Sequence, residues 1–224
     1  MELKIIARIR CDFKEKFGIP RQSGIAKTRA LIVFEPEYRV PDALRGLEGY
    51  SHLWLLWEFS EAKREGWSPT VRPPRLGGNK RMGVFATRSP YRPNPIGLSS
   101  VRLIEISDSN LYGKTITVEG ADLLDGTPIY DIKPYLAYTD SHEDAAGGFS
   151  DGVRGYALRV NFGLHLLEMI PEDKRGALIT ILENDPRPSY KEEGEQEYGM
   201  KYAEFDIFFK VDSGTLTVTK IKKI

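Results

Sequence analysis

Short apolar runs separated by turn residues fill the first two thirds of the chain, in the pattern typical of β-strands. The pattern predicts strands over Leu3–Ile9, Thr28–Glu35, Tyr50–Phe59, Met82–Thr87, Leu98–Ile106, Lys114–Glu119 and Ile129–Ile132. Three prolines and three glycines exclude regular structure over Gly66–Gly78. Because no long amphipathic helix precedes about residue 160, the spacing favours a β-sandwich or barrel over a doubly wound fold.

The last third of the chain has a different composition. The run Thr139–Gly155 is polar and contains glycine, as linkers do. A strand is expected over Ala157–Phe162, a helix that Pro171 opens and that continues through Asn184, and a hairpin of Phe205–Val211 and Thr215–Ile221. The chain is therefore predicted to have three parts, namely a β-domain over 1–138, a linker over 139–155 and a small α+β domain over 156–224.

Composition narrows the function classes. The 32 basic residues balance the 32 acidic ones, so the whole-chain charge does not by itself indicate nucleic acid or an anionic membrane. The single cysteine, Cys11, fits a reducing compartment, and the start MELKIIARIRCDF has the pattern of neither a signal peptide nor a membrane span. We therefore expect a cytoplasmic protein without a membrane partner. Three widely separated histidines predict no metal site, and His52 is interpreted as a hydrogen-bonded core side chain.

Positive charge gathers in one segment, Lys63 to Arg92, which holds eight basic residues and one acid. Its prolines restrict the backbone, so side chains such as Arg72 and Arg75 are presented on a preorganised surface that suits phosphates or a carboxylate. The alternative is a solvated loop whose charges pair with acids elsewhere.

The sequence Thr87–Ser100 places three prolines between two predicted strands. A rigid polar loop of this kind commonly binds a ligand, and Arg88, Arg92 and Asn94 would supply two planar cations and an amide. Gly97 would leave room for the backbone to approach the ligand. A structural turn with surface arginines is the alternative.

A second polar stretch, Leu123–Leu136, contains the turn sequence Asp125-Gly126-Thr127-Pro128. After it, Asp131, Lys133 and Tyr135 alternate, so a strand would place all three on one face. An acceptor, a cation and a phenol in a row indicate a site, although an ion pair between Asp131 and Lys133 is a fair alternative.

Five long segments resemble the YaeB family of tRNA N6-methyladenosine-forming methyltransferases, also called TrmO. They are KEKFGIPRQSG (14–24), LRGLEGYSHLWLL (44–56), the run from Trp67 to Ser99, DGTPIYDIKPYL (125–136) and DPRPSY (185–190). Together they span nearly the whole chain, and their composition is peculiar enough to be specific.

The resemblance implies a mainly β fold, a single-sheeted β-barrel with a small α+β carboxy-terminal domain, assembled as a homodimer. It also implies S-adenosylmethionine as cofactor and methylation of N6 of threonylcarbamoyladenosine beside the tRNA anticodon. By likeness, the cofactor contacts are Pro20, Arg21, Gln22, Ser60, Glu61, Arg88, Leu98, Asp125, Gly126, Thr127 and Pro128. Ser60-Glu61 departs from the His-Gln-like pair that bacterial relatives often carry.

Methyl transfer from a sulfonium needs alignment first and acid–base help second. Asp131 or Tyr135 would assist at the N6 nitrogen, with Lys133 and Asn94 as further catalytic candidates. Arg92, Lys133 or Arg187 would bind the threonyl carboxylate, and Arg72 and Arg75 would contact tRNA phosphates. Two other functions remain open: a non-catalytic RNA-binding module, and a methyltransferase for a small urea or amide.

Overall fold

The computed structural model describes residues 2–62, 66–73, 80–153, 155–187 and 194–224. Six strands pair in the order β1-β2-β7-β6-β3-β8, and β8 pairs back with β1, so the sheet is a closed barrel. Every neighbouring pair in it is antiparallel. The strands are β1 (Ala7–Arg10), β2 (Arg29–Phe34), β3 (His52–Glu58), β6 (Ile96–Ser109), β7 (Gly113–Glu119) and β8 (Pro128–Pro134).

Period-two alternation separates the inside of the barrel from its outer wall. Along β3, Leu53, Leu55 and Trp57 are buried, whereas His52 and the residues between them face outward. Side chains from all six strands meet in one apolar core, in which Ile9, Ile32, Leu53, Leu55, Ile116, Val118 and Ile129 are fully buried. Each such burial contributes roughly 1.5–3 kcal/mol, so the core fixes which residues can face outward.

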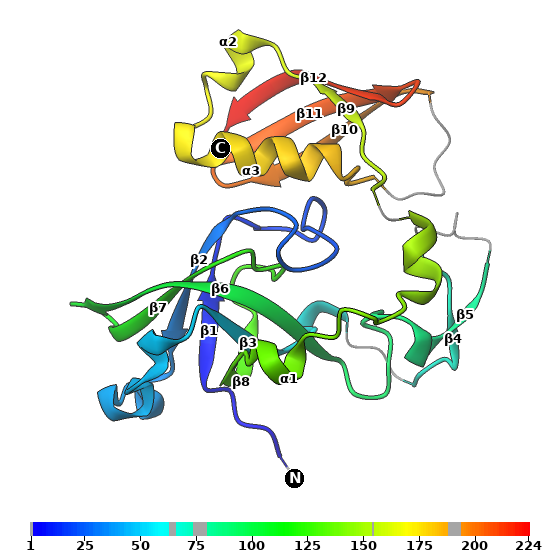
Figure 1. The fold of residues 1–224 in the computed structure, drawn as a ribbon. Coiled ribbons are helices and arrows are strands. Elements are labelled where there is room, and N and C mark those ends of the chain that lie inside the picture. The colour runs from blue at the N-terminus through cyan, green and yellow to red at the C-terminus, as the bar shows by residue number, and fades with distance from the viewer. Residues whose placement is uncertain (1, 63–65, 74–79, 154, 188–193) are drawn as a thin grey trace.

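The turn-rich segments correct two sequence expectations. Met82–Thr87 is not one strand, because only β5 (Met82–Gly83) is extended and Val84–Ala86 forms the 3-10 helix η6. The segment expected to lack regular structure contains the short strand β4 (Thr70–Val71), which pairs with β5. This hairpin lies well to one side of the barrel (Figure 1). Other short helices among the described residues before β9 are η1 (Pro36–Tyr38), η2 (Pro41–Leu44), η3 (Leu47–Gly49), η4 (Ser60–Ala62), α1 (Ala137–Asp140) and η7 (Gly148–Val153).

A second sheet, in the order β10-β11-β12-β9, forms the carboxy-terminal unit together with α2 (Leu164–Leu167) and α3 (Glu172–Glu183). Its strands are β9 (Arg159–Asn161), β10 (Gly194–Tyr202), β11 (Phe205–Asp212) and β12 (Thr215–Lys223). The predicted helix and hairpin are confirmed, whereas β10 had no counterpart among the predicted strands. The chain is mainly β with an α+β region at its carboxy terminus.

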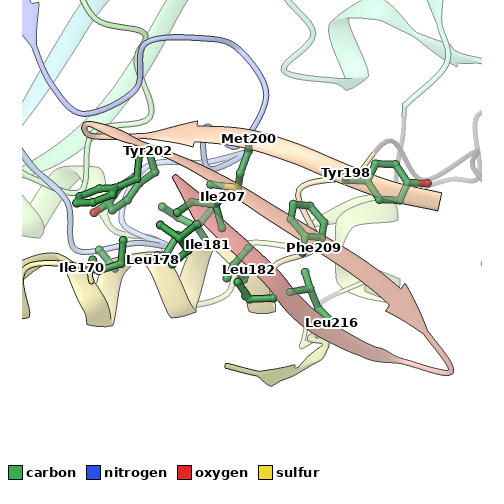
Figure 2. Packing of buried hydrophobic residues seen from close by; sticks show 14 of the residues in the cluster. Ile170, Leu178, Ile181, Leu182, Tyr198, Met200, Tyr202, Ile207, Phe209 and Leu216 are labelled. Atoms are coloured by element: carbon green, nitrogen blue, oxygen red, sulfur yellow. The ribbon is translucent and has the colours of Figure 1, made fainter. Parts of the chain in front are cut away.

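The core of this unit lies between α3 and the sheet. Leu178, Ile181 and Leu182 from the helix point toward Ile207 and Phe209 of β11 (Figure 2). The same cluster includes Phe13 and Ala26 from the segment between β1 and β2, so the loop after β1 is packed against the carboxy-terminal unit. That loop lies between the barrel and the second sheet (Figure 1).

Three contacts fix the loop in this position. Gly18, at a φ of +95° that disfavours other residues, lies against Met200, whose Cε would be 3.0 Å from an added Cβ. The backbone N–H of Lys201 donates to Glu15 Oε1 at 2.9 Å. Lys174 of α3 forms an ion pair with Asp12. The carboxy-terminal unit therefore holds a loop that continues into the predicted cofactor residues.

Candidate functional site

A pocket of about 470 Å³ lies on the outer wall of the barrel, and we call it the outer-wall pocket. It is lined by Ser23, His52, Trp54, Arg88, Leu98, Ser100, Tyr135 and Asp140. These side chains come from β3, β6, the residue that follows β8, α1 and two loops, and β3, β8 and α1 lie close together in Figure 1. A volume in this range accommodates a small-molecule or nucleotide ligand.

Strand register explains why these side chains meet. Because Leu53 and Leu55 point into the core, Trp54 must point outward. Trp54 lies opposite Ser100 on β6 and opposite Lys133 on β8. The wall of the pocket is therefore made by residues that share one face of three adjacent strands.

Asp140 fixes the aromatic part of the pocket. The indole Nε1 of Trp54 donates to Asp140 Oδ2 at 2.7 Å, and the backbone N–H of Leu136 donates to the same oxygen at 3.0 Å. These two hydrogen bonds, the Leu136 one foremost, lower the pKa of Asp140, so it stays ionised at neutral pH. The Tyr135 ring lies 5.4 Å from the Trp54 ring and 6.2 Å from the His52 ring, measured between centroids.

His52 corrects the sequence interpretation. It is exposed rather than in the core, and its Nδ1 lies 2.9 Å from Ser51 Oγ. The sequence also missed Trp54 and Asp140. The strand HLWLLWE is apolar at nearly every position, so periodicity could not show which side faces outward. The sequence pattern therefore carried no signal that could have found Trp54 or Asp140.

A second group of polar side chains surrounds Arg88. Its guanidinium donates to Gln22 Oε1, which brings together two predicted cofactor residues. Nearby, Asp122 accepts a hydrogen bond from Ser99 Oγ at 2.5 Å, and Ser99 accepts one from Trp57 Nε1 at 2.9 Å. Burial raises the pKa of Asp122, although Ser99 and the charge of Arg88 oppose that shift. Asp122 was not among the sequence candidates.

Other predicted cofactor segments are tied to the loop Lys14–Gly24. Lys14 forms a 2.9 Å ion pair with Asp125, and Lys16 donates to the backbone oxygen of Glu61 at 2.6 Å. Asp125 also accepts from the backbone N–H of Cys11 at 2.9 Å, and Thr127 is buried. The loop Lys14–Gly24, which includes residues 20–22, thus makes contacts with Glu61, Arg88 and Asp125. Of the predicted cofactor residues, Arg88 and Leu98 are the ones that line the outer-wall pocket.

The row Asp131, Lys133 and Tyr135 lies on the outer wall, as the alternation predicted. Lys133 Nζ is 2.8 Å from Asp131 Oδ2, and that hydrogen bond and charge raise the pKa of Lys133. The ion pair that the sequence left open as an alternative is therefore present. Both side chains are substantially exposed, at 62% and 43%, so the pair leaves their charges accessible to a ligand. Tyr135 lines the pocket itself.

The basic segment is only partly described, because Lys63, Arg64 and Arg75 lie outside the described residues. Arg72 and Asn94 are exposed. Arg92 is half-buried and donates to the backbone oxygen of Thr87 at 3.1 Å, which uses part of its guanidinium to hold the proline-rich loop. The space beside Gly97 is filled by the Trp57 ring, 2.2 Å from where a Cβ would be. The glycine there allows internal packing rather than approach of a ligand.

Arg187 has a structural place that the sequence did not suggest. It is 6% exposed, and its guanidinium makes two hydrogen bonds to the Asp185 carboxylate, at 2.8 and 2.9 Å. The expectation that Arg187 binds the substrate carboxylate is not supported by this placement, because its charge is already matched inside the protein. Arg21 donates to the backbone oxygen of Arg187 at 2.8 Å and to that of Asp185 at 3.3 Å.

Within the described residues, no group of three or more His, Cys, Asp or Glu side chains could hold a metal ion. No helix in that part of the chain is both long and apolar enough to cross a membrane. The Cys11 thiol donates to the backbone oxygen of Leu123, and burial raises its pKa to about 11, so it is a poor nucleophile.

The fold and the site define a class of protein: a closed β-barrel with a ligand-sized pocket on its outer wall, joined to a small α+β unit. Residues 8–141 match the tRNA-methyltransferase O N-terminal domain, and residues 160–224 match the TrmO C-terminal domain. The chain belongs to the tRNA-methyltransferase O family, and the resemblance found in the sequence is confirmed.

The relatives extend over nearly the whole chain. A tRNA (adenine(37)-N6)-methyltransferase of Escherichia coli K12 is 42% identical over 93% of this chain and 93% of its own length. A putative S-adenosylmethionine-dependent methyltransferase, RcsF, of Pseudomonas aeruginosa PAO1 is 40% identical over 90% of this chain and 89% of its own. The crystal structure of TrmO from Pseudomonas aeruginosa superposes with a TM-score of 0.80 at 32% identity, covering 100% of this chain and 97% of that one.

Proposed function

We propose that this protein is an S-adenosylmethionine-dependent methyltransferase that methylates N6 of threonylcarbamoyladenosine at position 37, beside the tRNA anticodon. The observation that carries the proposal is the outer-wall pocket, in which Arg88 and Leu98 share one cavity with Tyr135. Residues that the family likeness assigns to the cofactor thus share the pocket with a residue proposed to assist at N6. The E. coli relative, named for methylation of adenine 37, supports the same reaction.

The donor set of the pocket fits this cofactor. S-adenosylmethionine carries a carboxylate, hydroxyls, an adenine ring and a positive sulfonium. The Arg88 guanidinium suits the carboxylate, the hydroxyls of Ser23 and Ser100 suit polar groups, and Asp122 places a carboxylate near Arg88. The loop residues Pro20, Arg21 and Gln22, with Ser60, Glu61 and the turn Asp125–Pro128, would complete the cofactor site around Lys14–Gly24.

The cofactor, when bound, supplies an electrophilic methyl group. The residues of the chain align the acceptor and accept its proton. Rigid alignment comes from the proline loop, which Arg92 ties to Thr87, and from Trp54, which Asp140 holds. The N6 nitrogen of the modified base is urea-like, so a nearby acceptor helps to withdraw its proton, and Asp131 or Tyr135 takes this role.

The threonyl carboxylate of the substrate requires a cation near the pocket. Lys133 is suited to this role because it lies opposite Trp54 on the outer wall and is well exposed. Arg92, on the loop that continues into β6, is the further cation candidate, and Asn94 on the same loop remains a catalytic candidate.

The rest of the tRNA would be bound by the basic segment, through Arg72 and Arg75.

We also infer a homodimer. Trp67, just before β4, and Phe85, in η6 just after β5, expose 54% and 73% of their surface, with ring centroids 6.2 Å apart. Such exposed aromatic residues suit burial against a second copy. Sedimentation at micromolar concentration tests this, and a Trp67→Ser, Phe85→Ser variant should be monomeric. The expected location is the cytoplasm.

Two measurements test the proposed function. Calorimetry should give micromolar or tighter binding of S-adenosylmethionine, and absence of binding would instead indicate a non-catalytic RNA-binding module. Methyl incorporation should occur into tRNA from cells that make the threonylcarbamoyl modification and be absent from tRNA of cells that lack it. Equal incorporation into both tRNAs would refute the substrate, and transfer only to small ureas or amides would refute the tRNA assignment.

A further inference from the structure

Three aromatic side chains, His52, Trp54 and Tyr135, stand together on the outer wall of the barrel, and we call them the aromatic triad. Their ring centroids are 5.4 Å apart for Trp54 and Tyr135 and 6.2 Å apart for His52 and Tyr135. All three line the outer-wall pocket. They do not belong to the barrel core, which consists of inward-facing residues of the barrel strands.

A purely structural role accounts poorly for this arrangement. His52 is exposed and Trp54 and Tyr135 are half-buried, so the rings leave apolar surface in contact with water. At the same time the Trp54 ring is held in place, because Asp140 accepts its indole N–H and also ties the backbone of Leu136. A rigid aromatic surface that remains open in a pocket is preorganised for a flat ligand.

The chemistry of the triad identifies the kind of ligand. Aromatic side chains bind nucleobases by stacking, which works for a base that has left a helical stack. Asp140 and the hydroxyl of Tyr135 provide an acceptor and a donor at the rim of the same surface. Lys133, opposite Trp54, adds a positive charge for an anion attached to the base.

We infer that the aromatic triad is a purine-binding surface that stacks the acceptor adenine of the RNA. The inference rests on the proposed function, since two adenines, that of the cofactor and that of the RNA, could occupy the pocket. Placement distinguishes them. Gln22 and Arg88, expected at the cofactor, contact each other, and Ser100 lies opposite Trp54 on β6, on one side of β3. On the other side of β3, Lys133 lies opposite Trp54 on β8, the strand that carries Asp131 and leads into Tyr135. The triad therefore lies with the residues expected at N6.

The test uses the full chain and an anticodon stem–loop RNA with 2-aminopurine in place of the acceptor adenine. Stacking on an indole should quench its fluorescence. Trp54→Leu should abolish the quenching and weaken RNA binding at least about 10-fold, and His52→Ala should weaken it several-fold. Trp54→Phe keeps a ring and loses only the hydrogen bond to Asp140, so it should retain most of the affinity. Tyr138→Ala is the matched control, because Tyr138 on α1 is 84% exposed and is not among the pocket residues.

Affinity for S-adenosylmethionine, measured by calorimetry on the same samples, separates the two adenines. The inference requires that this affinity stay within about twofold in Trp54→Leu and His52→Ala. A loss of cofactor affinity with unchanged RNA binding would place the cofactor adenine on the triad and overturn the inference. Loss of quenching and affinity in Tyr138→Ala as well would also overturn it. Wild-type quenching without methyl transfer to tRNA would contradict the proposed function alone.

Discussion

An aspartate and a neighbouring basic residue form an ion pair in both regions of the protein, but the pair in the carboxy-terminal unit is buried and the pair on the outer wall of the barrel is exposed. The side chains of Arg187 and Asp185 are 7% and 12% exposed, and they form two hydrogen bonds with one another. Asp131 and Lys133 form an equally short ion pair on the barrel, at 43% and 62% exposure. The same kind of ion pair is therefore part of the packed interior in one region, whereas in the other region its charges remain available to a ligand.

Hydrogen bonds of the loop that contains Arg21 and Gln22 connect the two regions. Arg21 donates to the backbone oxygens of Asp185 and Arg187, and the next residue, Gln22, accepts a hydrogen bond from Arg88 beside the pocket. The buried pair thus supports the turn that holds the predicted cofactor loop. Changes in the carboxy-terminal unit should appear mainly as lost stability, and changes around the pocket as lost binding or rate.

The largest expected effect is on stability in Asp185→Ala. Removing one partner leaves Arg187 buried without a counter-charge, and we expect a loss of about 3–5 kcal/mol in the free energy of unfolding, measured by urea denaturation. Glu204→Ala is the control, because its pair with Lys223 is 60–70% exposed and should contribute less than about 1 kcal/mol. Equal losses in the two variants would contradict the contrast between the regions.

The same buried pair predicts a pH dependence. Burial raises the pKa of Asp185, but the hydrogen bonds and charge of Arg187 outweigh burial and hold it below the usual 3.8. A carboxyl whose pKa is lower in the folded state stabilises the protein above its unfolded pKa, and this contribution is lost as pH falls through the folded pKa. The stability difference between wild type and Asp185→Ala should therefore be constant near neutrality and shrink below about pH 3.8. A difference that grows in acid would contradict this.

On the barrel side, Asp131→Asn should lower the single-turnover methyl-transfer rate by about 100-fold if Asp131 acts as the base. The exposed pair with Lys133 contributes little to stability, so the melting temperature should change little. Cofactor affinity should also stay unchanged. A normal rate per folded molecule, with a lower melting temperature, would instead assign Asp131 to holding Lys133.

Arg88→Ala should weaken S-adenosylmethionine binding by about 1.5–3 kcal/mol, because it removes a charge-assisted contact and the partner of Gln22. Calorimetry measures this directly. Arg81→Ala serves as the control, since Arg81 is exposed and donates to Thr70 on the β4–β5 hairpin. An unchanged dissociation constant in Arg88→Ala would move the cofactor away from this part of the pocket.

The smallest effect concerns the basic segment. Arg72→Ala and Arg75→Ala should each reduce the salt dependence of tRNA binding by about 0.7–0.9 in the log–log slope, for one lost phosphate contact. Arg29→Ala, at an exposed position on β2, should leave the slope unchanged. If both arginine variants keep the wild-type affinity and slope, the tRNA lies elsewhere on the surface.

Local chemistry made much of this protein predictable from its sequence. Strand-like runs bounded by turn residues, TRALIVFE and KTITVE, located the strands β2 and β7, and Pro171 with the acidic pair after it located the start of α3. The spacing of Asp131, Lys133 and Tyr135 was enough to place them on one face, because side chains of a strand alternate wherever the strand lies. The long family segments identified the chain as TrmO-like.

The tertiary structure decided which side chains face the pocket and which are buried and paired, because the local sequence pattern does not show either. The strand HLWLLWE is apolar on both sides, so only its pairing with β6 and β8 shows that His52 and Trp54 face outward into a pocket. Asp122 and Asp140 are ordinary acids in sequence, and they gain their roles from Ser99 and Trp54, which are distant along the chain. Arg187 resembles a surface cation until Asp185 and the packed unit around it leave its charge buried and matched. The role of each of these side chains depends on its burial and on its hydrogen-bond or ion-pair partners. Both depend on contacts between segments that are distant in the sequence, and such contacts form only in the folded protein.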